Sequence, residues 1–205
     1  MIDLYSGTPG SGKSLHTAER LYYWLRLGRP AICNFDIRLD YVNKKQPDKL
    51  KFYYVPNDKL NPDYLIRFAQ DHFKGKVIKE DSIMLVIDEC QLMFNAREWS
   101  KVGRDKWLSF FTQHRKYGYH VILVAQFDRM IDRQIRSLIE YEFVHRKVGN
   151  FGIKGKALSI VMGGHVFVAV KVWYPMKEKV GAEFFRARKR FYRLYDTFGS
   201  FAAEK

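Results

Sequence analysis

Residues 7–14 read Gly-Thr-Pro-Gly-Ser-Gly-Lys-Ser, and this stretch decides the fold. It matches the pattern Gly-x-x-x-x-Gly-Lys-Ser/Thr in full. Glycines at this spacing let backbone N–H groups turn toward phosphate oxygens, in conformations that side chains would block. Lys13 is placed to reach the β- and γ-phosphates, and the Ser14 hydroxyl is a ligand for Mg²⁺. The sequence therefore predicts a nucleotide-binding loop made of Gly7, Thr8, Pro9, Gly10, Ser11, Gly12, Lys13, Ser14 and Leu15.

The residues on both sides of the loop support this interpretation over an ordinary glycine-rich turn. An apolar run, Ile2–Tyr5, precedes the loop and predicts a strand. After the loop, apolar residues recur at helical spacing up to Leu25, and Gly28 followed by Pro30 ends the predicted helix. A helix that starts at the loop directs the positive end of its dipole at the phosphates.

A second apolar run, Ile83–Ile87, ends in two acidic residues, Asp88 and Glu89. In an enzyme with this loop, the first acid holds Mg²⁺ through its water shell, so Asp88 is the predicted metal residue. A second acid beside it orients and deprotonates the attacking water, and Glu89 is the predicted catalytic base. The alternative is an acidic helix cap after a buried strand.

Gln126 directly follows another apolar run, Val121–Ala125. Ligands in α/β sheets bind at the carboxyl ends of the strands, so Gln126 is a candidate sensor of the γ-phosphate, the alternative being a simple loop residue. Arg129, Arg133 and Arg136 come next in the chain, and one of them is a candidate arginine finger supplied to a neighbouring subunit. For each arginine the alternative is a surface charge.

Strands and helices are expected to alternate up to about residue 140. The predicted strands lie at 2–5, 31–35, 51–55, 83–87 and 121–125. The predicted helices lie at 15–25, 64–73, 104–117 and 132–138. This order predicts an α/β fold: a P-loop NTPase with three layers, α/β/α, around a mostly parallel central sheet. We expect residues 1–140 to form this P-loop NTPase core.

The pattern changes after residue 140. Strands are predicted at 141–148, 156–162 and 165–173, with a hairpin turn at Gly163-Gly164. A helix is predicted at 182–195. Residues 141–205 are therefore expected to form a β-rich, antiparallel and basic extension that packs on the same domain.

The chain is strongly basic, with 36 Lys and Arg against 22 Asp and Glu, a formal net charge of +14. Residues 141–205 hold 13 of the basic and 5 of the acidic residues, a net charge of +8. Such a surface attracts nucleic acid, anionic lipid or an acidic partner, or is simply well solvated. The longest nearly apolar stretch, 157–170, is interrupted by polar residues and glycines and is too short to cross a bilayer.

Several segments beyond these motifs resemble the zonular occludens toxin family, whose amino-terminal part is related to the assembly ATPases of filamentous phages. The resemblance covers about residues 1–145. It rests on the start of the chain through Ser14, on Asn34-Phe-Asp36, on 86–91 (Val-Ile-Asp-Glu-Cys-Gln), on 112–118 (Thr-Gln-His-Arg-Lys-Tyr-Gly), on 124–126 and on 132–141.

The resemblance implies an ATPase on the cytoplasmic side of the bacterial inner membrane that drives assembly and extrusion of filamentous phage. It implies ATP and Mg²⁺ as cofactors, a homo-oligomeric ring, and phage single-stranded DNA or phage coat and assembly proteins as partners. Family members usually continue into a membrane helix, so membrane association is expected through a segment that is not present in these 205 residues.

Two other functions stay open. A small-molecule kinase can use the same loop, with the arginines after Gln126 in a lid. Glu89 argues against it, because a kinase must exclude water rather than activate it. The third possibility is a nucleotide-switched adaptor that recruits a partner without rapid turnover.

Overall fold

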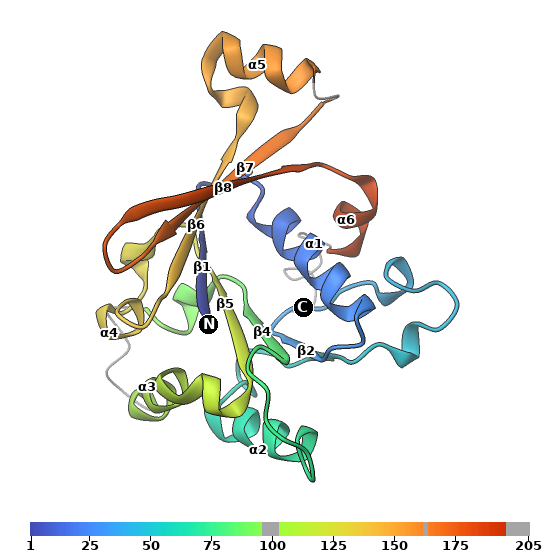
Figure 1. Ribbon diagram of the computed structural model, residues 1–205, viewed down its shortest axis with the longest axis vertical. Coiled ribbons are helices and arrows are strands. Elements are labelled where there is room, and N and C mark those ends of the chain that lie inside the picture. The colour runs from blue at the N-terminus through green and yellow to red at the C-terminus, as the bar shows by residue number, and fades with distance from the viewer. Residues whose placement is uncertain (96–102, 162–163, 196–205) are drawn as a thin grey trace, which may run out of the picture.

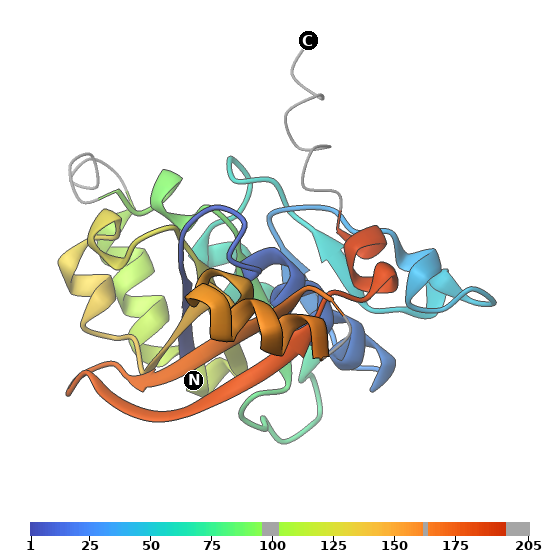
Figure 2. The same cartoon turned by 90° about the horizontal axis from the view of Figure 1, so that it is seen from above.

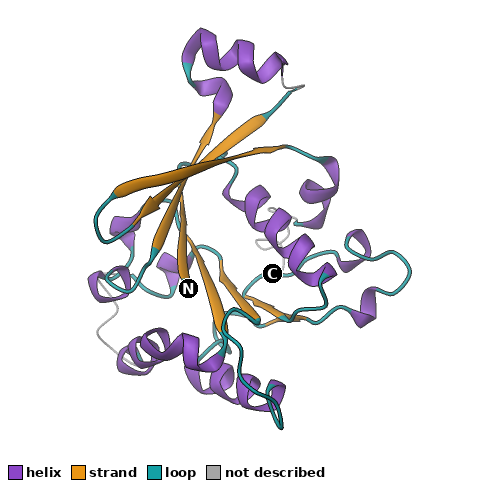
Figure 3. Ribbon diagram, in the orientation of Figure 1, coloured by secondary structure: helices purple, strands orange, loops and turns teal. Residues whose placement is uncertain are grey.

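The computed structural model describes residues 1–95, 103–161 and 164–195. Its centre is one eight-stranded sheet with the strand order β3-β2-β4-β5-β1-β6-β7-β8 (Figures 1 and 3). The strands are β1 (Ile2–Ser6), β2 (Ala31–Cys33), β3 (Phe52–Tyr54), β4 (Ile83–Ile87), β5 (Tyr119–Val124), β6 (Tyr141–Lys147), β7 (Val166–Trp173) and β8 (Glu178–Arg186). Strands β1 to β6 pair in parallel, and β7 and β8 extend the edge in antiparallel pairing.

Helices cover both faces of the sheet (Figure 1). The α-helices are α1 (Lys13–Arg26), α2 (Pro62–His72), α3 (Arg104–Gln113), α4 (Arg133–Arg136), α5 (Gly152–Val161) and α6 (Lys189–Leu194). Short 3₁₀ helices are η1 (Leu39–Tyr41), η2 (Pro47–Lys49), η3 (Cys90–Leu92), η4 (His114–Tyr117), η5 (Asp128–Met130) and η6 (Val148–Asn150). The predicted three-layer α/β/α fold with a mostly parallel sheet is confirmed.

The sequence of β4 shows how one strand serves two cores. Its side chains alternate between the faces of the sheet, as the period of a strand requires. Ile83, Leu85 and Ile87 belong to the core under α2 and α3. Met84 and Val86 belong to the core under α1 and α6. A strand buried on both faces reads as a continuous apolar run, which is why this strand was predicted with its observed bounds.

The helix ends follow ordinary capping rules. Asn61 caps α2, because its side chain accepts a hydrogen bond from the Tyr64 N–H at 2.9 Å, and Pro62 occupies the first turn. Helix α1 differs, because its N-cap is Gly12, with φ of 98°, and no side chain of a described residue caps it. The first turn of α1 therefore points free N–H groups toward the loop.

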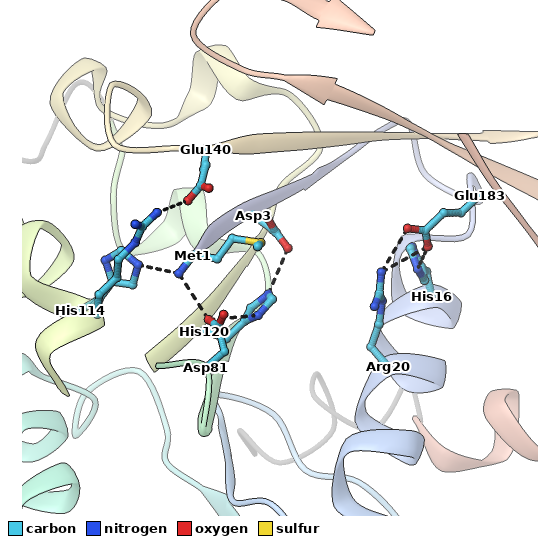
Figure 4. Close-up of polar contacts among 10 residues, drawn as sticks. Met1, Asp3, His16, Arg20, Asp81, His114, His120, Glu140 and Glu183 are labelled. Atoms are coloured by element: carbon cyan, nitrogen blue, oxygen red, sulfur yellow. Dashed lines mark hydrogen bonds and ion pairs between the residues drawn. The ribbon is translucent and has the colours of Figure 1, made fainter. Parts of the chain in front are cut away.

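Polar contacts hold the amino-terminal end of β1 (Figure 4). The Met1 amino group lies 2.8 Å from His114 Nε2 and 3.4 Å from an Asp81 oxygen. Asp3, inside β1, pairs with His120 at 3.0 Å. His114 and His120 thus fasten β1 in the sheet rather than contributing to a reactive site.

Two predicted elements after residue 147 are wrong. Residues 156–161 lie in the helix α5 instead of a strand, and the turn predicted at Gly163-Gly164 falls partly outside the described residues. A short apolar run has no periodicity that separates a strand from a helix. Residues 182–186 belong to β8 instead of a helix, because this segment pairs with β7 over its whole length, and only Lys189–Leu194 is helical.

The β-rich part continues the main sheet. Strand β6 pairs with β1, from Asp3 with Tyr141 to Ser6 with Val144, and β7 and β8 follow it at the edge. Helix α5 projects from the end of β6 and β7 in Figure 1. The boundary at residue 140 stays a prediction about domains, and the sheet runs across it without a break. In the part of the chain that the structure describes, no helix is long and apolar enough to cross a membrane.

Candidate functional site

The loop between β1 and α1 has the backbone that its glycines predict. Gly7 has φ of 141° and Gly12 has φ of 98°, both outside the range that side chains favour. A Cβ on Gly7 would lie 2.6 Å from the His145 carbonyl oxygen, and a Cβ on Gly12 would lie 2.7 Å from the Phe167 ring. Both glycines are therefore required by conformation and by space.

One backbone hydrogen bond joins this loop to the segment after β5, and another lies within the loop. The Gly7 N–H donates to the Gln126 carbonyl at 3.1 Å, and the Ser11 N–H donates to the Thr8 carbonyl at 3.1 Å. The Ser11 hydroxyl is buried and has no hydrogen-bond partner among the described residues. A buried hydroxyl without a partner in a loop of turned N–H groups fits an anionic ligand that supplies the missing acceptor.

Lys13 curls back over the loop. Its Nζ donates to the Gly7 carbonyl at 2.7 Å and to the Thr8 carbonyl at 3.4 Å. Burial lowers the pKa of Lys13, and the negative charges of Glu89 and Asp88 oppose that shift. Lys13 therefore interacts electrostatically with both acids. This position suits an amine that lies between a phosphate and the acidic end of β4.

Asp88 follows the last residue of β4 and is tightly held. Its backbone N–H donates to Asn34 Oδ1 at 2.7 Å, and Asn34 Nδ2 donates to its carbonyl oxygen at 2.9 Å. On the side chain, Oδ1 accepts the Glu89 N–H at 2.9 Å and Oδ2 accepts the Tyr195 hydroxyl. Burial raises the pKa of Asp88, while these donors and Lys13 act in the opposite direction.

Glu89 stands in the left-handed backbone region, with φ of 46°. A residue with a side chain rarely adopts this conformation, and such strain is concentrated at functional sites. The Gln91 amide donates to a Glu89 carboxylate oxygen and orients it. Gln91 is buried and was not predicted as a site residue.

Gln126 lies at the carboxyl end of β5, between the strands that carry the loop and the acids. Its carbonyl anchors Gly7, and the residue lines a cavity of about 540 Å³ beside the loop. The walls of this cavity come from the loop, from the segment after β5, and from β6 and η6, including Glu142, His145, Arg146, Asn150 and Phe151. The cavity lies on the side of the loop that faces β6.

The structure brings Lys13, Asp88 and Glu89 together, but it does not bring Arg133 or Arg136 to them. Both arginines lie on α4, which Figure 1 shows well away from the start of α1. Arg133 is exposed, and Arg136 is partly buried with a Nε that has no partner among the described residues. A role in hydrolysis within the same chain does not fit this position, so their role as a finger stays a prediction about a neighbouring subunit.

Two buried histidines, His16 and His145, take part in a hydrogen-bonded network next to the loop. His145 on β6 and His16 on α1 share a hydrogen bond of 2.8 Å between His145 Nε2 and His16 Nδ1. His16 also lies 3.5 Å from Glu183 of β8, which Arg20 binds through both carboxylate oxygens at 3.2 Å (Figure 4). Burial and the proximity of His16 lower the pKa of His145 to about 3. The network ties α1 to the antiparallel edge of the sheet.

Sequence reasoning missed Tyr195 and His145. Each contacts a predicted site residue only because β6 and α6, remote in sequence, pack beside the loop and β4. No spacing pattern marks such a residue, since its role follows from the tertiary fold. Asn34 was noted only as part of the family resemblance.

The residues present fit a nucleoside triphosphate with Mg²⁺. The loop offers turned N–H groups and Lys13 for phosphate oxygens, and Ser14 and Asp88 are the residues that would hold the metal ion. Among residues 1–95, 103–161 and 164–195, no group of three or more His, Cys, Asp or Glu is placed to hold a metal ion. Mg²⁺ typically keeps several waters and binds substrate phosphates, so phosphate oxygens and water would supply its other ligands.

Comparison with known structures confirms the fold. The N-terminal domain of zonular occludens toxin from Neisseria meningitidis superposes with a TM-score of 0.54 at 19% identity, over 95% of this chain and 98% of that one. The genome packaging NTPase of Sulfolobus turreted icosahedral virus 2, solved in complex with ATP-gammaS, gives a TM-score of 0.51 at 17% identity, over 90% of this chain and 96% of that one. At these identities the likeness establishes a P-loop NTPase fold.

Comparison of sequences identifies relatives among filamentous phages. The Gene 1 protein of Enterobacteria phage fd is 26% identical over 97% of this chain and 59% of that protein. The Gene 1 protein of Salmonella phage IKe is 25% identical over 80% of this chain and 46% of that protein. The chain thus spans about half the length of these relatives. The family model for Zonular occludens toxin (Zot) matches residues 1–200, and the chain belongs to the zonular occludens toxin family.

Proposed function

We propose that the chain is a Mg²⁺-dependent ATPase that powers the assembly of filamentous phage. The observation that carries this proposal is the placement of Lys13, Asp88 and Glu89 at the carboxyl ends of neighbouring parallel strands. Glu89 has a left-handed backbone conformation, and its carboxylate accepts a hydrogen bond from Gln91. The phage relatives and the P-loop NTPase fold support it.

The chemistry follows from these positions. A water oxygen forms a bond to the γ-phosphorus, and the bond from that phosphorus to the β–γ bridging oxygen breaks, leaving its electron pair on ADP. Glu89 accepts the proton that the water loses. Lys13 exchanges its loop carbonyls for phosphate oxygens and neutralises the charge that develops there. Bound Mg²⁺ would supply further neutralisation of the phosphates.

The process that hydrolysis powers is proposed from the family and from the net charge of the chain. The family resemblance implies a ring of subunits on the cytoplasmic side of the inner membrane, acting on phage single-stranded DNA or on coat and assembly proteins. The net charge of +14 supports an acidic partner such as DNA. We propose that Gln126 senses the γ-phosphate and that Arg133 or Arg136 reaches the site of a neighbouring subunit.

The kinase and adaptor alternatives differ from the motor in the fate of the γ-phosphate. A kinase would transfer it to a metabolite, and an adaptor would release it very slowly. The strained Glu89 beside the metal residue favours transfer to water.

Phosphate release with ATP and Mg²⁺ tests the proposal. Replacing the general base should slow release by about 100-fold or more while nucleotide binding persists, because general base catalysis typically contributes factors of 10² to 10⁴. We therefore expect Glu89→Gln to bind ATP but hardly hydrolyse it. Glu80→Gln, at an exposed carboxylate outside the site, is the matched control and should behave as the wild type. Equal rates for Glu89→Gln and the wild type would refute the assignment.

A further inference from the structure

Tyr195, which directly follows α6, reaches Asp88, the acid proposed to bind the metal. Its hydroxyl donates a hydrogen bond to Asp88 Oδ2, across 107 positions of sequence. Because the Glu89 N–H donates to Oδ1 at 2.9 Å, each oxygen of the carboxylate has a protein donor. The orientation of the Asp88 side chain is thus fixed from two directions.

The position of Tyr195 depends on α6 and on the segment after β2. The Tyr195 ring meets the Phe35 ring edge to face, with centroids 4.6 Å apart and planes at 78°. The Arg38 N–H donates to the Leu194 carbonyl at 3.0 Å, and Figure 2 shows α6 beside this part of the chain. Phe191 and Leu194 are fully buried in the core that α6 shares with α1. Tyr195 is therefore held in place by packing as well as by its hydroxyl.

The segment after β2 contacts both Asp88 and Tyr195. Asn34 binds the Asp88 backbone at its N–H and its carbonyl, and the next residue, Phe35, packs on Tyr195. A shift of α6 would consequently change the side-chain hydrogen bond of Asp88 while Asn34 keeps its backbone in place. The side chain of the acid can respond to α6 without a rearrangement of β4.

We propose that Tyr195 is a positioning residue for the metal–nucleotide complex and that it couples α6 to the Mg²⁺ site. This inference rests on the function proposed above. A hydrogen-bond donor to a metal-binding carboxylate orients the carboxylate toward the metal. Loss of such a donor typically weakens metal binding by 10- to 100-fold. Coupling between sites is reciprocal, so binding of Mg²⁺ and nucleotide must in turn stabilise the docked position of α6.

The test compares Tyr195→Phe with Tyr192→Phe in the 205-residue chain. Both substitutions remove one hydroxyl from the α6 region, but Tyr192 is 51% exposed and contacts neither acid. A non-hydrolysable ATP analogue is titrated in EDTA and then at increasing Mg²⁺. We expect Tyr195→Phe to raise the Mg²⁺ concentration at half-effect about tenfold, with the affinity in EDTA unchanged. Tyr192→Phe should match the wild type.

Hydrogen exchange of the amides in 189–195 gives a second readout that does not involve turnover. In the wild type, Mg²⁺ added to the analogue complex should slow this exchange, and in Tyr195→Phe it should not. Phe35→Leu keeps the hydroxyl but loosens the ring, and should shift the Mg²⁺ midpoint in the same direction by a smaller factor. The Phe35→Leu variant keeps the inference testable if Tyr195→Phe folds poorly.

Unchanged Mg²⁺ midpoints in Tyr195→Phe would overturn the inference and leave the proposed function standing. Equal shifts in Tyr195→Phe and Tyr192→Phe would also overturn it, because they would indicate a general loosening of α6. If the wild type fails to bind the analogue with or without Mg²⁺, the proposed function fails, and the inference fails with it.

Discussion

At the residue scale, two glycines of the loop that look alike in sequence have different surroundings in the structure. Gly10 and Gly12 both have positive φ, of 74° and 98°. A Cβ on Gly10 would meet no atom of the described part of the chain within 4 Å, whereas a Cβ on Gly12 would lie 2.7 Å from Phe167. The motif requires glycine at position 12 and leaves position 10 open, and the fold gives a reason, because β7 closes over Gly12 and not over Gly10.

This difference predicts unequal costs for two alanine substitutions. Gly10→Ala should lower the free energy of unfolding by about 1 kcal/mol, from left-handed strain alone. Gly12→Ala adds overpacking against Phe167 and should cost about 2–4 kcal/mol. Urea unfolding of both variants measures the difference. Equal losses would mean that the contact between the loop and Phe167 does not form.

The site residues that the sequence predicts are those whose chemistry is local. Lys13 and Ser14 are fixed by the spacing of the loop, and Asp88 and Glu89 by their place after a buried strand. Their proximity follows from the parallel pairing of β1, β5 and β4. Tyr195 and His145 escaped because their roles arise from packing between distant segments.

At the scale of elements, β6 and α1 are joined by a buried pair of imidazoles. His145 is 1% exposed, and burial together with His16 lowers its pKa to about 3. An unfolded histidine titrates near 6.5. Between these two pKa values, His145 is protonated in the unfolded chain and neutral in the folded chain. The free energy of unfolding therefore decreases as the pH falls through this range.

The pH dependence of stability should therefore change when His145 is replaced. From pH 7 to pH 5, this one site should lower the free energy of unfolding by about 2 kcal/mol, and His145→Gln should remove that decrease. Urea unfolding at both pH values gives the comparison. His165→Gln, at an exposed position, serves as the control and should keep the wild-type dependence. A slope unchanged by His145→Gln would contradict the buried neutral imidazole.

The elements that were predicted wrongly lie at the antiparallel edge. Helix α5 was predicted as a strand because residues 157–161 are almost entirely apolar and give no period. Gly155 packs so closely on η6 that a Cβ would lie 2.2 Å from the Val148 carbonyl, a contact that sequence cannot reveal. The last residues of β8, 182–186, were predicted as the start of a helix, whereas they pair with β7 in an antiparallel hairpin.

At the scale of the whole molecule, one sheet carries both the loop of residues 7–14 and the antiparallel strands β7 and β8. The loop-bearing strand β1 lies between β5, on the side of the acids, and β6, on the side of the antiparallel strands. Contacts from both halves converge on the loop: Gln126 binds Gly7, and His145 closes against it. The loop is therefore held from both halves of the sheet.

The most direct test of the central claim is the affinity of the chain for a non-hydrolysable ATP analogue, measured by calorimetry with Mg²⁺. The wild type should bind, and Lys13→Ala should bind about 10- to 100-fold more weakly, because a charge-assisted hydrogen bond contributes about 1.5–3 kcal/mol. Lys74→Ala, at an exposed lysine beyond the end of α2, should bind as the wild type does. Absence of binding by the wild type, or equal binding by Lys13→Ala, would contradict a nucleotide held by residues 7–14.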